Sequence, residues 1–119
     1  MKVNIEYTDE FGQWWSTLNQ SQQNDLVAVV MLLEESGTQL GFPYSSKIHA
    51  SRHSRMRELR IQSGGRPLRV FYAFDPRRTA ILLIGGDKTG DNRFYERYIP
   101  IADRLFDIYL KEIENEGLI

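Results

Sequence analysis

Hydrophobic and polar positions follow a clear pattern in the middle of the chain, over residues 56–86. Residues 56–61 alternate apolar with charged side chains, whereas residues 68–74 and 79–84 are almost wholly apolar. Short runs of this kind are typical of β-strands, and the two apolar runs are expected to be covered on both faces. The paired glycines and proline of residues 62–67 predict a turn. The pattern therefore predicts three consecutive strands of a meander.

The twofold side-chain period of a strand fixes which residues share a face. If Ile61 pairs with Leu68 across the glycine turn, Arg60 lies directly opposite Arg69. Like charges in opposed positions are destabilising, so this pairing indicates a site where an anion binds. The alternative is that Arg60 pairs with Glu58 or a helix carboxylate on an ordinary solvated strand, because charged runs are usually solvated faces.

The next hairpin brings in a third cation. Residues 75–78 read DPRR, which predicts a type I turn with proline at its second position. That turn would place Arg69 opposite Leu83 or Ile84, where the chain leaves the third strand toward Lys88. The three cations are therefore expected to converge at one end of the sheet.

The flanking segments predict helices around this meander. Residues 2–7 alternate as a half-buried strand, and Thr8 or Asp9 is expected to cap a first helix. A second helix is expected to end at Gly37, forming a helical hairpin with the first. The apolar residues of the first helix recur at helical spacing, and its tryptophans are expected to belong to the core: Phe11, Trp14, Trp15 and Leu18. Residues 38–55 show no periodicity and predict a long loop.

The C-terminal part keeps a helical apolar stripe to about Glu116, and Gly117 is expected to end it. Pro100 cannot donate a backbone hydrogen bond, which predicts a short helix near 92–98 and a new or kinked helix from about 100. The order strand, two helices, three strands, helix indicates an α+β protein with an antiparallel-rich sheet, and residues 1–119 are expected to form a single domain.

Charge is distributed unevenly along the chain. Residues 47–104 contain 13 Lys and Arg against 6 Asp and Glu, and 11 of these cations are Arg. Arginine is the residue suited to bidentate phosphate contacts, so this middle segment predicts a surface that faces a polyanion. Arg77 and Arg78, at a turn tip, are expected to serve solubility only. The chain has no cysteine, no apolar run long enough to span a membrane and no signal-peptide core, which favours a soluble cytoplasmic protein.

Two histidines lie in the long loop, His49 and His53. Both could act as acid–base groups near neutral pH, although surface positions without a catalytic role are the favoured interpretation. A pair spaced by four residues, without a carboxylate or a helix, is a poor metal-binding pattern. No metal and no other cofactor is expected.

The motif ELRI, a turn, LRVFYAF and then AILLIGGDKTGDNRFYERYIPIAD resemble the RelE/ParE toxin superfamily. Within it, the chain is most similar to the HigB-like, phage-related branch of bacterial type II toxin–antitoxin modules. The resemblance implies a RelE-like, microbial-RNase-like sheet with an N-terminal helical hairpin and a C-terminal helix. It also implies a ribosome-dependent mRNA endonuclease that inhibits translation and is neutralised by a cognate antitoxin.

The resemblance assigns site residues by position: Arg69 opens the second meander strand, Lys88 follows the last strand and Tyr95 opens the C-terminal helix. Arg60 matches a basic residue of the first meander strand. Glu58 is either a general base or, as we favour, the group that orients Arg60 or Arg69. Further RNA- or ribosome-binding candidates come from the basic segment: Lys47, Arg52, Arg55, Arg57, Arg66 and Arg93.

RNA cleavage without a metal needs a base, an acid and charge stabilisation of the attacked phosphate. Arg69 is expected to clamp the phosphate, and Lys88 to lower the pKa of the 2′-OH or to act as base. Tyr95 is expected to stack on a base or to steer a proton. The expected partners are mRNA, the ribosome and a helix-turn-helix antitoxin. Operator DNA is expected to be contacted only through the antitoxin, and no membrane is expected as a partner. The alternatives are a ParE-like poison of DNA gyrase without nuclease activity, and a nucleic-acid-binding adaptor.

Overall fold

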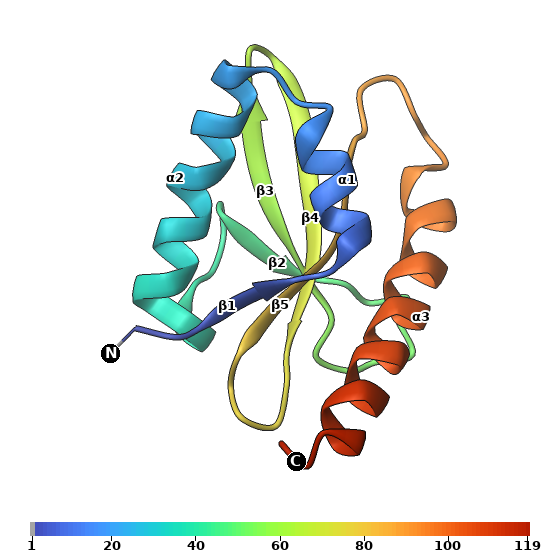
Figure 1. Ribbon diagram of the computed structural model, residues 1–119. Helices are drawn as coiled ribbons and strands as arrows, with labels where there is room; N and C mark the ends of the chain where they lie inside the picture. The colour runs from blue at the N-terminus through green and yellow to red at the C-terminus, as the bar shows by residue number, and fades with distance from the viewer. Residues whose placement is uncertain (1) are drawn as a thin grey trace.

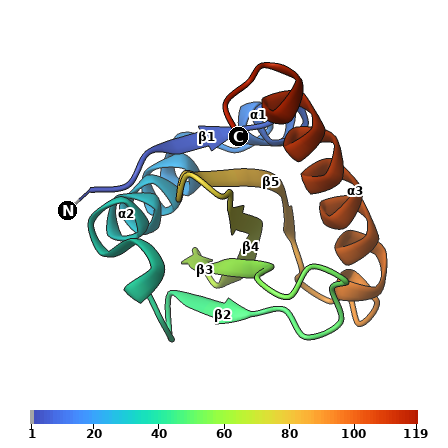
Figure 2. The same cartoon turned by 90° about the horizontal axis from the view of Figure 1, so that it is seen from below.

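A five-stranded sheet lies at the centre of the molecule, with helices on both of its faces (Figures 1 and 2). The computed structural model describes residues 2–119. Along the chain the elements are β1 (Ile5–Tyr7), α1 (Asp9–Ser16), α2 (Gln20–Ser36), the short 3₁₀ helix η1 (Gly37–Gln39), β2 (Ser45–Lys47), β3 (Arg57–Ser63), β4 (Arg66–Phe74), β5 (Ala80–Asp87) and α3 (Phe94–Asn115). The order and composition confirm the expected α+β class.

The sheet has the strand order β1-β5-β4-β3-β2. β1 runs parallel to β5, and the other neighbours are antiparallel. The expected antiparallel-rich sheet, with the first strand at an edge of the meander, is therefore confirmed. No helix among residues 2–119 combines the length and the hydropathy that a membrane crossing requires.

The helical hairpin begins and ends at the residues that the sequence indicates. The Thr8 side chain accepts a hydrogen bond from the Phe11 backbone amide at 3.0 Å, which caps α1. Asn19 and Gln22 form a capping box at the start of α2, and Gly37 follows its last turn with a φ of 56°. Both helices pack on one face of the sheet, α1 over β5 and α2 over β3.

The register of the first meander hairpin is confirmed. Ile61 pairs with Leu68, and Arg60 pairs with Arg69 across β3 and β4. The turn is tighter than predicted, because the strands continue to Ser63 and resume at Arg66. Gly64 and its neighbour Gly65 have φ values of 56° and 80°, the left-handed conformation that a two-residue hairpin needs.

The second hairpin differs from the prediction. Arg69 lies opposite Gly86, and not opposite Leu83 or Ile84. One reason is the longer turn, which includes Arg78 at a φ of 65° and makes Ala80 the partner of Phe74. The other is a register shift next to Phe71, where β5 has one extra residue.

β5 also extends three residues beyond its predicted end, through Gly85 and Gly86. These glycines lie inside the strand because helices approach the backbone closely on both faces. A Cβ on Gly85 would lie 2.2 Å from the Trp14 ring, and a Cβ on Gly86 would lie 2.7 Å from the Tyr98 ring. Glycine at these two positions is therefore a requirement of packing and does not mark the end of the strand.

Two further predictions were wrong. The 38–55 loop contains a 3₁₀ turn and the edge strand β2, which is too short to show an alternating pattern. Pro100 lies inside α3, which continues unbroken from Phe94 to Asn115. Burial of the apolar stripe of α3 on both sides of Pro100 outweighs the missing hydrogen bond. Gly117, with a φ of 75°, follows the end of α3 as expected.

The sheet separates two hydrophobic clusters. The cluster under α3 contains Phe71, Ile81 and Phe94, together with neighbouring aromatic rings. The cluster under α1 and α2 contains Leu59, Val70 and the partly buried tryptophans. Alternate residues of β3 and β4 therefore point to opposite sides, as the period of 2 requires.

Candidate active site

Two buried charges face each other on the central strands of the sheet. Glu58 on β3 is 5% exposed and Arg69 on β4 is 4% exposed. The Arg69 Nε atom lies 3.5 Å from Glu58 Oε1, close enough for an ion pair, yet within residues 2–119 Nε has no hydrogen-bond acceptor. Its Nη1 atom donates to the Leu68 carbonyl at 3.0 Å. The interior therefore satisfies this guanidinium only in part.

Two more cations lie close to this pair. Arg60 Nη1 lies 3.7 Å from Glu58 Oε2, and the Lys88 Nζ atom lies 5.0 Å from the centre of the Tyr95 ring. Burial lowers the pKa of Lys88, and the charges of Arg69 and Arg60 lower it further, against the opposing effect of Glu58. Three cations around one carboxylate leave an excess of positive charge that an anionic ligand would neutralise.

Hydrogen bonds hold the Glu58 carboxylate in place. The Tyr95 hydroxyl donates to Glu58 Oε1 at 2.6 Å, and the Ser46 hydroxyl donates to Oε2 at 2.7 Å. Burial and the contact with Glu58 raise the pKa of Tyr95, so the phenol keeps its proton at neutral pH. With both of its oxygens occupied by donors, Glu58 is better placed to orient cations than to accept a proton.

The structure thus brings together the five side chains that the sequence singled out for catalysis: Glu58, Arg60, Arg69, Lys88 and Tyr95. These residues come from elements that are distant in the sequence. Arg60 and Arg69 meet because they are paired on adjacent strands, and Lys88 directly follows β5. Their roles in a reaction stay a prediction.

Two neighbours were not expected from the sequence. Ser46 on the edge strand β2 anchors Glu58, and the Phe42 ring lies 5.1 Å below the Arg60 guanidinium while 76% of Phe42 is exposed. Neither residue belongs to a periodic pattern, since both lie in the stretch that the sequence presents as a loop. An aromatic residue next to a proline was the only signal that the sequence offered.

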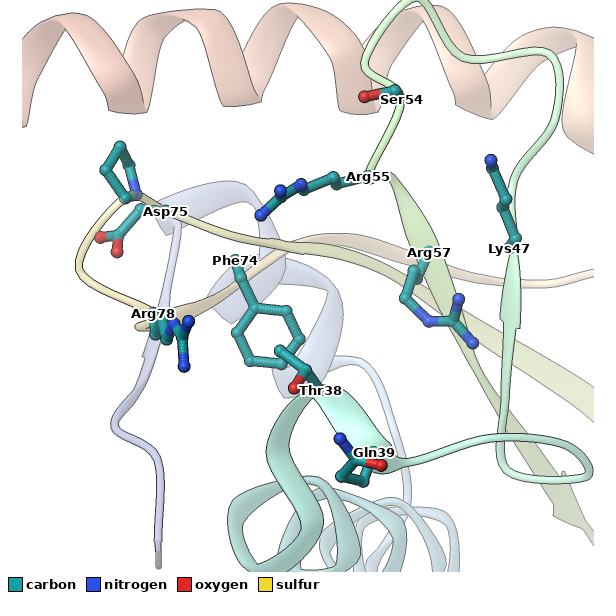
Figure 3. A pocket seen from close by; sticks show the side chains of 10 residues that line it. Thr38, Gln39, Lys47, Ser54, Arg55, Arg57, Phe74, Asp75 and Arg78 are labelled. Atoms are coloured by element: carbon teal, nitrogen blue, oxygen red, sulfur yellow. The ribbon is translucent and has the colours of Figure 1, made fainter.

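The six further basic candidates separate into groups. Lys47, Arg55 and Arg57 line one hollow on another part of the surface (Figure 3). Arg52 forms an ion pair and a two-pronged hydrogen bond with Asp107. This pairing ties Arg52 to α3, so it is less available for RNA than the three cations of the hollow.

The other two candidates are Arg66 and Arg93. Arg66 pairs with Asp87 at 3.0 Å across the hairpin end. Arg93 precedes α3, is exposed, and has no carboxylate partner within the described part of the chain.

One of the two turn arginines differs from expectation. Arg77 is not a free solubilising charge, because its Nη2 atom lies 3.0 Å from the buried carboxylate of Asp75 and also bonds the Tyr109 hydroxyl. Burial and Asp75 raise the pKa of Tyr109. This network joins the β4–β5 turn to α3.

The two histidines have contacts typical of the surface. The His53 Nε2 atom lies 2.7 Å from Asp107 Oδ1, and its ring packs on Phe106. His49 is exposed. In the part of the chain that the structure covers, no group of three or more His, Asp and Glu side chains is arranged to hold a metal ion.

The fold as a whole is similar to one known from RelE proteins. A RelE chain in a RelE–RelB complex from the archaeon Pyrococcus horikoshii OT3 superposes with a TM-score of 0.56 and 12% sequence identity. The match covers 76% of this chain and 99% of that chain. At this sequence identity the similarity shows the fold, and the fold of this chain is therefore RelE-like.

Sequence comparison defines the family more closely. The model of the family described as "Phage derived protein Gp49-like (DUF891)" matches residues 13–107. A Mycobacterium tuberculosis protein named "Putative toxin HigB3" is 40% identical over 106 residues, covering 88% of this chain and 91% of that protein. Another, named "Putative toxin HigB2", is 36% identical over 109 residues, covering 90% of this chain and 54% of that protein. The chain belongs to the Gp49-like family, the HigB-like branch of the RelE/ParE toxin superfamily.

Proposed function

We propose that this protein is the toxin of a type II toxin–antitoxin module and that it cleaves mRNA on the ribosome without a metal ion. The family and the names of its relatives support the toxin assignment. The single observation that supports cleavage is the buried Arg69 guanidinium, which shares one carboxylate with Arg60 and lies close to Lys88. Such an excess of positive charge suits a phosphate whose negative charge grows during the reaction.

In this proposal the 2′-OH attacks its own phosphate, and a 2′,3′-cyclic phosphate and a free 5′-OH are formed. Arg69 binds two non-bridging oxygens of the phosphate, because a guanidinium presents a fork of donors. Arg60 adds charge from the neighbouring strand. Both interactions strengthen as the phosphate becomes dianionic, which is the condition for lowering the barrier.

Lys88 is the proposed base. Its lowered pKa makes the neutral amine accessible at a lower pH than in free lysine, so it can take the 2′-OH proton. The departing 5′ oxygen takes a proton from solvent, because Tyr95, whose pKa is raised, is a poor acid. Tyr95 instead lies beside Lys88 and fixes Glu58.

Phe42 supplies a surface for a nucleobase in this proposal. Its ring is largely exposed, and among residues 2–119 the charged group that lies over it is Arg60. Stacking of a base on an exposed aromatic ring is worth about 1–3 kcal/mol in single-stranded nucleic-acid binding. The stacked base would place the next phosphate near Arg60 and Arg69.

The proposed partners follow from the family. A cognate helix-turn-helix antitoxin would neutralise the protein and alone would contact operator DNA. In the cytoplasm, mRNA would be the substrate and the ribosome the partner on which it is cleaved. The solved neighbour from P. horikoshii is itself a complex of RelE with RelB.

The chemistry of the cut ends tests the proposal. Purified protein is added to ribosomes programmed with an mRNA, and the fragments are analysed for terminal groups. The proposal expects 5′-OH ends, which accept a label from polynucleotide kinase without prior phosphatase treatment. Fragments with 5′-phosphate ends, or no fragments with active ribosomes, would contradict the mechanism.

A further inference from the structure

A second cationic site lies away from the Glu58–Arg69 cluster. An open hollow of about 790 Å³ is lined by residues of η1 and β2, of the segment that leads into β3, and of the end of β4 with the turn that follows it (Figure 3). Four of its lining residues are cations: Lys47, Arg55, Arg57 and Arg78. Figure 3 shows Arg55, Arg57 and Arg78 around the ring of Phe74, with Lys47 farther away, beyond Arg57.

These four cations have no carboxylate partner in the part of the chain that the structure describes. Among the ion pairs of residues 2–119, none involves Lys47, Arg55, Arg57 or Arg78. Many of the other arginines, such as Arg52, do have a carboxylate partner. Converging cations without counter-charges repel one another, so the hollow is better suited to an anion than to water alone.

The one carboxylate in the lining is already fully bonded. Asp75 is 4% exposed, and its oxygens accept hydrogen bonds from Arg77 and Tyr109 and from the Thr79 backbone amide. It therefore contributes little negative charge to the hollow. The same bonds hold the β4–β5 turn firmly, which fixes the backbone from which Arg78 extends.

The hollow is separate from the candidate active site. Arg57 extends to the face of the sheet that carries Leu59, where its Nε atom donates to Ser45 at 3.0 Å. Arg69 lies on the opposite face. Phe74 is five residues further along β4, a separation of roughly 16 Å at the rise of a strand. One phosphate cannot occupy both places.

We propose that this hollow binds the backbone of single-stranded RNA, with a base stacked on Phe74. The combination of arginines, a lysine and a half-buried aromatic ring favours a nucleic acid, because an acidic peptide would not need the ring. Thr38, Gln39 and Ser54 add neutral hydrogen-bonding groups to the lining. The choice of RNA rests on the proposed function, and the site would anchor RNA away from the point of cleavage.

The test measures binding without cleavage. The probe is a short fluorescein-labelled RNA, 2′-O-methylated at every position, and its anisotropy is titrated with the full-length protein at several salt concentrations. The double variant Arg55→Gln/Arg78→Gln is compared with the control Arg104→Gln/Lys111→Gln, which removes two exposed charges from α3. Thermal unfolding verifies that both variants are folded.

We expect the Arg55/Arg78 variant to lose about tenfold in affinity and its log–log salt slope to become shallower by about 1.4, the loss of two single-strand phosphate contacts. The control should keep the wild-type values. Phe74→Leu should weaken RNA binding about fivefold or more, while leaving the binding of inorganic polyphosphate unchanged.

Three results would overturn the inference. They are equal losses in the two double variants, an unchanged affinity for RNA in Phe74→Leu, and displacement of the RNA by polyglutamate as effectively as by unlabelled RNA. The last result would point to an acidic protein segment as the occupant. Because the probe has no free 2′-OH, failure here leaves the cleavage proposal intact, and an inactive nuclease would leave the binding result intact.

Discussion

Arg69 carries a positive charge that the interior of the protein satisfies only in part. Its nearest carboxylate is shared with Arg60, and its Nε atom has no hydrogen-bond partner in residues 2–119. Evolution toward stability alone would favour an apolar residue at such a position, since buried ion pairs are often matched or exceeded by hydrophobic replacements. The residue is therefore best explained by what it binds.

Replacement of Arg69 should separate stability from activity. Arg69→Met keeps most of the buried volume and leaves Glu58 with Arg60, Ser46 and Tyr95, so we expect thermal stability to stay close to wild type. Cleavage should fall by about 10²–10³, the usual effect of losing one transition-state donor. Arg69→Lys keeps the charge without the fork and should recover only part of the activity.

The control for this series is Arg104→Ala, an exposed position on α3. Activity is measured by primer extension on ribosome-bound mRNA, and stability by thermal unfolding. Full activity of a folded Arg69→Met protein would place the reaction elsewhere. Unfolding of Arg69→Met would make Arg69 a structural residue.

Lys88 makes the reaction depend on pH. Its pKa lies below that of free lysine because of burial and the charges of Arg69 and Arg60. If it is the base, kcat/KM should rise with pH and level off below the ordinary lysine pKa, as the amine becomes neutral. Lys88→Arg cannot lose its proton in this range and should give low activity without that rise. The same rising limb in Lys88→Arg would exclude Lys88 as base.

The lowered pKa also has a consequence for folding. The unfolded chain binds the Lys88 proton more tightly than the native protein does, so the free energy of unfolding should increase as pH rises from the lowered pKa to the ordinary one. Lys88→Gln should remove this contribution and leave stability at neutral pH equal or slightly higher.

At the scale of elements, α3 contains a proline that lowers the stability of the helix. Pro100 is exposed and is the seventh residue of the helix, where it removes a backbone hydrogen bond. A proline in a helix interior costs about 3 kcal/mol relative to alanine, partly offset by its stiffening of the unfolded chain by about 0.4–1 kcal/mol.

We therefore expect Pro100→Ala to increase the free energy of unfolding by about 2 kcal/mol. Urea denaturation followed by circular dichroism measures this change. Ala28→Pro in α2 is the matched opposite substitution, at an exposed position, and should destabilise by a similar amount or more. No gain from Pro100→Ala would show that the surrounding backbone has already adapted to the proline.

Most elements could be predicted from the sequence because their signals are local. The caps at Thr8 and Asn19 and the alternation in β3 and β4 need no information from elsewhere in the chain. The register of Arg60 with Arg69 followed from the period of 2 once the glycine turn was recognised. These parts of the fold, and the three cations of the site, could be predicted from the sequence for that reason.

The errors arose where distant contacts decide the structure. The sequence ends the strand before Gly85 and Gly86. The structure continues it through them, because the Trp14 and Tyr98 rings lie too close for any side chain at these positions. Strand β2 forms only because it pairs with β3. This pairing places the Ser46 hydroxyl where it donates a hydrogen bond to Glu58. The hollow around Phe74 joins four separate segments, so no pattern within one segment indicates it.

At the scale of the whole molecule, charge is divided between segments. Residues 47–104 carry a clear excess of cations, while residues 1–46 contain one lysine against six acidic residues. The acidic segment includes α1 and α2, and the basic one includes the candidate active site and the cationic hollow. Such a distribution orients the protein toward a polyanion.

An antitoxin that covers the active site should respond to this charge. We expect it to present acidic or apolar elements near Arg60, Arg69 and Lys88, and its affinity to fall as salt concentration rises. Surface plasmon resonance at increasing salt measures this dependence. Affinity that does not change with salt would instead indicate steric blocking through an apolar surface.

The central claim, that the protein is a toxin that cuts translated RNA, is tested most directly by mapping RNA ends in cells after induction. The wild-type protein and Arg69→Lys are expressed at equal levels without an antitoxin, and new 5′ ends are sequenced across the transcriptome. The account predicts abundant new ends inside translated messages for the wild type and far fewer for Arg69→Lys. Growth arrest with intact RNA and an induced DNA-damage response would contradict it and would point to a poison of DNA gyrase.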